Sequence, residues 1–269
     1  METQVTVALF GFPWDGSSSY ARGPALAPGI IRSVLFSDAS SPYSLSGADV
    51  REIISSCHFQ ALPDDAEACR KTITNNISNS IQTGAKSLSL GGDHAITFPI
   101  LRAIKQHHGP VNVLHIDAHP DLYEDFEGDR FSHACPFARA IEDGCINTLI
   151  QVGIRSASPE QRAFGDRHGV IMLGADEIDN ISYDKLVAPL YVSIDLDGLD
   201  PAFAPGVSHP EPGGLSSRDV LTILSKLKTP LIGADIVELN PEKDINLATA
   251  NVAARLVKEL APLLSAGSN

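Results

Sequence analysis

Short apolar segments recur along the chain, and stretches with the period of a helix separate several of them. Because β-branched residues dominate the apolar segments, each of them predicts a strand. Most of these segments are largely apolar and do not alternate with polar residues, which is typical of strands that helices cover on both faces. The seven predicted strands are residues 5–10, 86–90, 111–116, 148–152, 170–173, 190–194 and 231–237.

Three stretches predict helices that pack on these strands. Residues 65–81 place Ile73, Ile77 and Ile81 four positions apart on one helical face, residues 217–227 open with a serine cap, and residues 251–264 repeat the apolar spacing. Alternating strands and helices predict an α/β fold, in which a mostly parallel sheet lies between two helical layers.

The chain shows no linker, internal repeat or low-complexity segment. Its two Gly/Pro-rich stretches, 11–28 and 200–214, are predicted to be loops. A length of 269 residues, 43% of them hydrophobic, suits one large domain. We therefore expect a single domain over residues 1–269.

The charge balance excludes two classes of partner. Lys and Arg number 20 against 33 Asp and Glu, a net charge of −13, so nucleic acid and anionic membranes would be repelled. No segment is long and apolar enough to span a bilayer, and residues 1–5 lack the basic start of a secretory signal. Four cysteines without a Cys-x-x-Cys pair suit a reducing compartment, so we expect a cytoplasmic protein with no membrane or nucleic-acid partner.

Acidic and histidine residues follow three of the predicted strands. They occupy residues 91–94, 117–121 and 195–197. Ligands bind beyond the carboxyl ends of the strands of a parallel sheet. In the second and third clusters the polar side chains step by two, so those within each cluster can share one face of an extended segment.

Charge arithmetic predicts what these residues bind. Four carboxylates gathered at one site cannot all remain ionised without a counterion, and neither segment offers a Lys or Arg nearby. Two divalent cations would cancel the four charges, and two imidazoles would complete their ligands. Oxygen-rich ligands without thiolates favour Mn²⁺, with Ni²⁺, Co²⁺ or Fe²⁺ as alternatives. The predicted ligands are His94, Asp117, His119, Asp121, Asp195 and Asp197.

Together these motifs resemble the arginase/agmatinase (ureohydrolase) family, and most closely its plant-type branch. The sequences 91–94 (GGDH), 117–121 (DAHPD), 193–201 (SIDLDGLDP) and 237–241 (VELNP) carry the resemblance, which runs from about residue 5 to residue 264. It implies a three-layer α/β/α fold with about eight parallel strands. It also implies two Mn²⁺ ions, hydrolysis of a cationic guanidino substrate to urea and an amine, and a homo-oligomer, either a trimer or a hexamer.

The resemblance also implies roles for individual residues. The same six residues would hold the metals, and Asp121 would also orient the nucleophile. Glu238 would hold the substrate guanidinium, and His133 would pass a proton to the leaving amine. Beside the motifs, we expect Asp93 to orient a ligand or close its turn, and His115 to be a packed core residue.

Two departures from the family pattern leave the substrate open. Tyr123 replaces an asparagine that helps arginases to bind the amino-acid carboxylate, and residues 153–158 contain no acid to bind an α-amine. Agmatine or a shorter guanidino acid is therefore as good a candidate as arginine. We expect His209 to line the pocket for the substrate tail, with a role in shaping its loop as the alternative.

Three other functions compete with this interpretation. A thiol hydrolase could use His133 with Cys135. A non-catalytic relative could bind a cationic metabolite or an active partner. A formiminoglutamase or another amidine hydrolase could use the same metal site on a different bond.

Overall fold

The computed structural model describes residues 6–266, in which eight parallel strands form one sheet. The strands lie side by side in the order β2-β1-β3-β8-β7-β4-β5-β6. They are β1 (Val7–Phe12), β2 (Ile54–Phe59), β3 (Lys86–Gly91), β4 (Val111–Ile116), β5 (Ile146–Val152), β6 (Ile171–Leu173), β7 (Leu190–Asp195) and β8 (Leu231–Val237).

All seven predicted strands are present, and their ends differ from the predicted ones by at most two residues. Val5, the predicted start of the first strand, lies outside the described residues, as do the other N-terminal residues used to judge a leader sequence. The eighth strand, β2, was not predicted from its residues. It lies at the edge of the sheet and exposes several of its side chains, so its sequence lacks a continuous apolar run.

The helices include five that the periodicity did not predict. They are α1 (Ala27–Leu35), α2 (Val50–Ile53), α3 (Ala66–Gln82), α4 (Thr97–His108), α5 (Pro136–Glu142), α6 (Pro159–His168), α7 (Ser217–Ser225) and α8 (Ala248–Ser265). The three predicted helices correspond to α3, α7 and α8. The cap of α7 is Ser216, which forms a capping box with Asp219. Among residues 6–266, no helix combines the length and apolarity needed to cross a membrane.

The predicted loop over residues 11–28 is wrong at both of its ends. Strand β1 continues through Phe12, and helix α1 begins at Ala27 with Pro28 in its first turn. Proline is tolerated there because the first N–H groups of a helix have no partner within the helix. Helices α5 and α6 also begin with a proline, which sequence analysis reads more readily as a loop.

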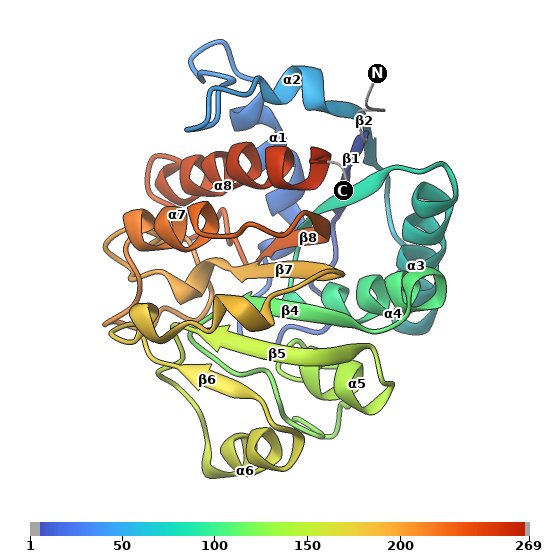
Figure 1. Cartoon of the computed structure of the whole chain (residues 1–269), viewed down its shortest axis with the longest axis vertical. Coiled ribbons are helices and arrows are strands. Elements are labelled where there is room, and N and C mark those ends of the chain that lie inside the picture. Colours follow the sequence, from blue (N-terminus) through green and yellow to red (C-terminus); the bar gives the residue numbers. More distant parts are fainter. Residues whose placement is uncertain (1–5, 267–269) are drawn as a thin grey trace.

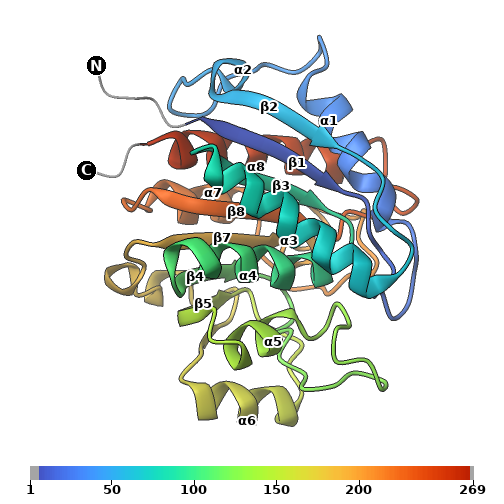
Figure 2. The same ribbon diagram turned by 90° about the vertical axis from the view of Figure 1, so that its right-hand side faces the viewer.

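Two layers of helices enclose the sheet, which confirms the α/β/α prediction. Helices α1, α7 and α8 cover one face, and α3, α4 and α5 cover the other (Figures 1 and 2). On the first face Ile31 and Val257 are fully buried, and on the second face Ile73 and Phe137 are buried to within 1% of complete.

The four predicted motifs follow four neighbouring strands. Strands β3, β8, β7 and β4 lie side by side, and their carboxyl ends meet at one edge. The chain leaves β3, passes through α4 and returns in β4, so β8 and β7 lie between these two strands. A crevice forms where strand order reverses in this way, and it is the usual ligand site of such sheets.

Gly92 allows the motif after β3 to pass close to the loop that follows β1. The Asp93 N–H donates a hydrogen bond to the carbonyl oxygen of Trp14 at 2.8 Å, and a Cβ on Gly92 would overlap this same carbonyl. Glycine is therefore required where the loop after β1 crosses the turn after β3.

We expect Gly92→Ala to lower the free energy of unfolding by roughly 2–3 kcal/mol, because backbone atoms must move to accommodate the methyl group. Gly29→Ala is the matched control. Gly29 is exposed in α1, no atom lies within 4 Å of its added Cβ, and the change should stabilise the helix by about 0.5–1 kcal/mol. Denaturant unfolding of both metal-free variants measures the difference, and equal midpoints would contradict the assignment.

Candidate metal centre and substrate pocket

The imidazole of His94 lies among three carboxylates that come from two other segments of the chain. Its Nδ1 is 3.0 Å from Asp121 Oδ2, 3.2 Å from Asp195 Oδ2 and 3.3 Å from Asp117 Oδ2. His94 begins the 3-10 turn after β3, Asp117 follows β4 and Asp195 ends β7. The structure therefore brings together four predicted ligands through the ends of three strands.

His119 forms a second group with the remaining ligand. Its Nδ1 is 3.1 Å from Asp197 Oδ2 and 3.5 Å from Asp117 Oδ1. Asp117 thus turns one oxygen toward each histidine and links the two groups. A carboxylate that is shared in this way is what a pair of neighbouring cations requires.

One nitrogen in this cluster has no partner. His94 Nδ1 is completely buried and makes no hydrogen bond of acceptable geometry with any described residue, although three carboxylate oxygens surround it. Buried polar atoms are rarely unpaired, and a neutral imidazole nitrogen facing carboxylates is a good metal ligand. These residues therefore fit a metal ion.

The charges in the cluster also favour a cation. Burial and the neighbouring carboxylates raise the pKa of Asp195 well above its usual range and that of Asp197 to about 7. Although burial disfavours its charged form, His119 has its pKa raised to about 12 by Asp197 and Asp117. Without a metal, protons must neutralise the site, so metal ions compete with protons for it.

His115 and Asp93 lie immediately behind these ligands. His115 is buried against Phe137, but its description as a packed core residue is incomplete, because its Nε2 lies 2.8 Å from Asp117 Oδ2. Asp93 caps the 3-10 turn through the N–H of Ala95 and accepts a hydrogen bond from the N–H of Ser17. Asp93 therefore closes its turn, as predicted, and also ties down the loop after β1.

Glu238 and His133 form a hydrogen-bonded pair beside the cluster. Glu238 Oε1 accepts a hydrogen bond from the N–H of His94 at 3.0 Å and lies 3.0 Å from His133 Nδ1, while His133 Nε2 lies 2.9 Å from Ser19 Oγ. Burial lowers the pKa of His133, but the bond to Glu238 outweighs this effect and raises it to about 9.

Two of these acids have an unusual backbone conformation. Asp121 has a φ of 53° and Glu238 a φ of 65°, in the left-handed region that favours glycine. Each such residue costs on the order of 1–3 kcal/mol, and residues of this kind concentrate at functional sites. The fold therefore tolerates strain at two of the acids that line the cavity.

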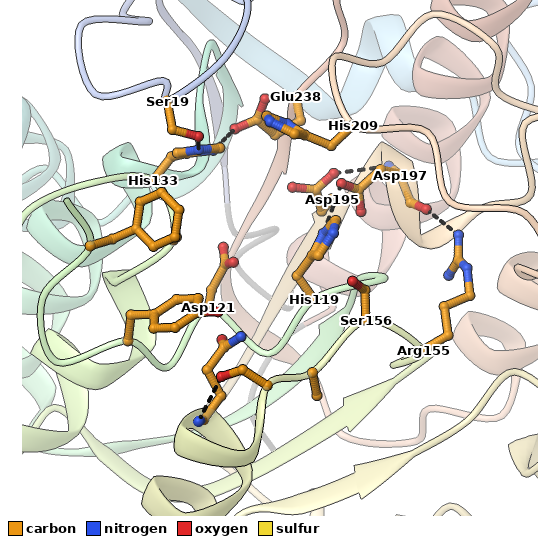
Figure 3. A pocket seen from close by; sticks show the side chains of 16 residues that line it. Ser19, His119, Asp121, His133, Arg155, Ser156, Asp195, Asp197, His209 and Glu238 are labelled. Carbon is orange, nitrogen blue, oxygen red and sulfur yellow. Dashed lines mark hydrogen bonds and ion pairs between the residues drawn. The ribbon is translucent and has the colours of Figure 1, made fainter.

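One cavity of about 560 Å³ is lined by the Glu238–His133 pair and by four of the six predicted metal ligands. Figure 3 shows His133, Glu238 and His209 on one side and His119, Asp195 and Asp197 on the other. Tyr123 also lines the cavity, so every residue that the sequence assigned to the substrate faces the same space. Buried His94 and Asp117 lie behind its wall.

The model of the arginase family matches residues 5–262. This chain belongs to that family. It is 41% identical to the protein named Arginase 1, mitochondrial, of Arabidopsis thaliana, over 97% of this chain and 82% of that protein. It is 33% identical to a guanidinopropionase of Pseudomonas aeruginosa, over 96% of this chain and 86% of that protein. The solved structure of arginase from Medicago truncatula superposes with a TM-score of 0.91 at 38% identity, covering 98% of this chain and 89% of that one.

Membership of the arginase family defines the reaction class. Enzymes of this family are hydrolases of carbon–nitrogen bonds in linear amidines, and this chain is such a hydrolase. The cluster of His and Asp side chains at the strand ends agrees with the family's dependence on metal.

Sequence analysis missed several residues that line the cavity. Ser156 and Ser158 follow β5, and the rule that sites lie at strand ends would have found them. The Arg155 guanidinium donates hydrogen bonds to the carbonyl oxygens of Asp197 at 2.7 Å and Glu211 at 2.6 Å, so it supports the loops of the site. Ser19, which hydrogen-bonds to His133, has no motif around it.

The environment of Cys135 weighs against a thiol nucleophile. Cys135 is fully buried, and burial together with Asp121 raises the pKa of its thiol to about 12. Its sulfur contacts the carbonyl oxygen of Asp129 at 3.7 Å, and Cys135 is not among the residues that line the cavity. Because the thiolate is the reactive form, this cysteine is unsuited to nucleophilic attack.

We expect Mn²⁺ to bind more tightly as the pH rises from about 6 to about 8, because binding displaces protons that the metal-free site holds. Asp197, with a pKa of about 7, and protonated His119 supply these protons. Calorimetric titration in two buffers of different ionisation enthalpy counts them. The matched control is Asp179→Asn, which changes an exposed acid. This variant should release as many protons on binding Mn²⁺ as the wild type does. An affinity that does not change with pH would contradict this account.

Proposed function

We propose that this chain is a binuclear manganese-dependent amidinohydrolase that cleaves a small cationic guanidino compound to urea and an amine. The observation that carries the proposal is the Glu238–His133 pair, which shares one cavity with two groups of metal-type ligands. Together these provide a carboxylate for the guanidinium, an acid for the leaving amine and a site for two cations.

Glu238 is suited to bind the guanidinium. A planar cation with several N–H groups is best held by a carboxylate that accepts paired hydrogen bonds. Contacts with the His94 N–H and with His133 Nδ1 orient the carboxylate through Oε1, and no described residue hydrogen-bonds to Oε2. Burial of Glu238 strengthens the attraction to a positively charged substrate.

When bound, the two metal ions would lower the pKa of a water molecule and stabilise the negative charge on the attacking oxygen. Asp121, which lines the cavity, would orient the attacking water by accepting a hydrogen bond from it.

His133 would protonate the departing amine. Its pKa, raised to about 9, keeps it protonated at neutral pH, and it loses this proton as the pH rises through that value. Ser19 holds Nε2 and Glu238 holds Nδ1, so the ring has a defined orientation. A positioned acid of this kind accelerates proton transfer by about 10²–10⁴-fold.

The far end of the cavity leaves three candidate substrates. Its wall contains the neutral groups of Tyr123, Ser156 and Ser158. The guanidinium of Arg155, the only one that the described residues place there, is occupied by backbone carbonyls. No acid lies among residues 153–158 to bind an α-amine. Relatives named arginase and guanidinopropionase support arginine and shorter guanidino acids, with agmatine as a third candidate.

We also propose a single catalytic domain over residues 1–269 that assembles as a homo-oligomer, either a trimer or a hexamer. The family match over residues 5–262 supports the domain. Four free cysteines suit a reducing compartment, for which we propose the cytoplasm, although the relative from Arabidopsis thaliana is named mitochondrial.

Urea release tests this function. With Mn²⁺, the enzyme should release urea from at least one of arginine, agmatine, guanidinobutyrate, guanidinopropionate and guanidinoacetate, and EDTA dialysis should abolish this activity. Glu238→Gln should lower kcat/KM by about 10²–10³-fold, because it removes the charge that binds the guanidinium. Glu242→Gln, which changes an exposed acid four residues later, is the matched control.

Two outcomes would favour the competing functions. Metal-loaded protein that binds these compounds without releasing urea would favour a non-catalytic relative. Release of formamide from formiminoglutamate would favour the other amidine hydrolase.

We expect His209→Ala to change the order in which these substrates are preferred. The His209 ring lies 5.2 Å from that of His133 and 5.8 Å from that of Tyr20, at the wall of the cavity. Comparing kcat/KM across the panel measures the effect, with His168→Ala at an exposed position as control. An unchanged order of preference would assign His209 to shaping its loop.

A further inference from the structure

A chain of buried hydrogen bonds connects His94 to an acid that does not reach the cavity. His94 Nε2 lies 2.9 Å from Ser193 Oγ, and Ser193 Oγ–H donates a hydrogen bond to Asp235 Oδ1 at 2.6 Å. All three residues are completely buried. We propose that Asp235 is a positioning residue that, through Ser193, presents Nδ1 of His94 to a metal ion.

The strands of the sheet build this chain. Ser193 on β7 is in register with Asp235 on β8, so their side chains leave neighbouring strands on the same face. His94, in the turn after β3, reaches the same place from the other side of β8. The chain of hydrogen bonds therefore depends on three segments that lie at least about 40 positions apart in the sequence.

The second oxygen of Asp235 is also occupied. Oδ2 accepts hydrogen bonds from the hydroxyls of Tyr191 at 2.7 Å and Thr97 at 2.8 Å. Burial and Asp235 raise the pKa of Tyr191 well above its usual range, so this hydroxyl keeps its proton and remains a donor. Three hydroxyl groups therefore donate to the two oxygens of Asp235, and no cationic side chain of the described residues forms an ion pair with it.

The direction of the hydrogen bonds then determines the state of the imidazole. Because Ser193 gives its only proton to Asp235, its oxygen accepts the hydrogen of His94 Nε2. A neutral imidazole with its proton on Nε2 has its lone pair on Nδ1, the atom that lies among Asp121, Asp195 and Asp117. Asp235 thereby selects the tautomer that can bind a cation and holds the ring in place.

Asp235→Asn should reverse this arrangement without changing the shape of the side chain. An amide that keeps its oxygen toward the two hydroxyls of Tyr191 and Thr97 turns its N–H₂ toward Ser193. Ser193 then accepts from the amide and directs its own proton at His94 Nε2, which moves the imidazole proton to Nδ1. This tautomer cannot bind a metal through Nδ1.

Metal binding, measured without substrate, tests this inference, which rests on the proposed metal centre. We expect wild-type protein to bind two Mn²⁺ ions per chain and Asp235→Asn to bind one of them about 10–100-fold more weakly. Tyr191→Phe is the matched control, because it removes one bond to Asp235 but lies off the path to His94; it should bind both ions with wild-type affinity. Calorimetry and metal analysis give affinity and stoichiometry, and circular dichroism in EDTA gives the fold and its thermal midpoint.

Each outcome decides between positioning and general support of the fold. Wild-type affinity for both ions in folded Asp235→Asn would overturn the inference, as would equal losses of affinity in Asp235→Asn and Tyr191→Phe. If Asp235→Asn does not fold, Ser193→Ala breaks the same path, and unchanged affinity in that variant would overturn the inference. If the wild type binds no Mn²⁺, the proposed function itself fails, and the role of Asp235 fails with it.

Discussion

The repulsion among buried carboxylates is the constraint on which the rest of this structure depends. Asp117, Asp121, Asp195 and Asp197 lie together with little exposure to water, and their charges cannot coexist without positive charge between them. The raised pKa values of Asp195 and Asp197 express this cost in the metal-free site. Two divalent cations would cancel it, and the arrangement of Asp117 between two histidines provides for both.

Holding like charges together requires a rigid frame, which the parallel sheet supplies. The ligands follow β3, β4 and β7, and Glu238 follows β8, so each comes from the end of a hydrogen-bonded strand. Further contacts hold these ends from behind: Arg155 binds the Asp197 carbonyl, His115 contacts Asp117, and Asp235 reaches His94 through Ser193. Such outer contacts orient metal ligands and adjust their affinity.

Chemistry and substrate choice depend on different parts of the same cavity. The strand ends supply the charged groups that any amidine hydrolysis needs, whereas Tyr123, Ser156 and His209 lie on the loops beyond them. Loops tolerate substitution better than strands, because fewer buried contacts depend on them. This division agrees with a family in which relatives of one fold carry the names of different guanidino substrates.

The sequence by itself determined the central strands and the identity of the candidate ligands. Strands that are covered on both faces are apolar without interruption, and the aspartate and histidine motifs are local patterns whose charge alone demands a cation. The sequence did not predict edge strand β2, because its exposed side chains interrupt the apolar pattern. It did not predict helices α5 and α6, because each begins with a proline, which is more typical of a loop. Only the tertiary structure decided that Asp117 links the two histidines, that Ser19 supports His133 and that Asp235 stands behind His94. These contacts join residues from separate strands and loops, and the order of strands across the sheet, which no local pattern encodes, brings them together.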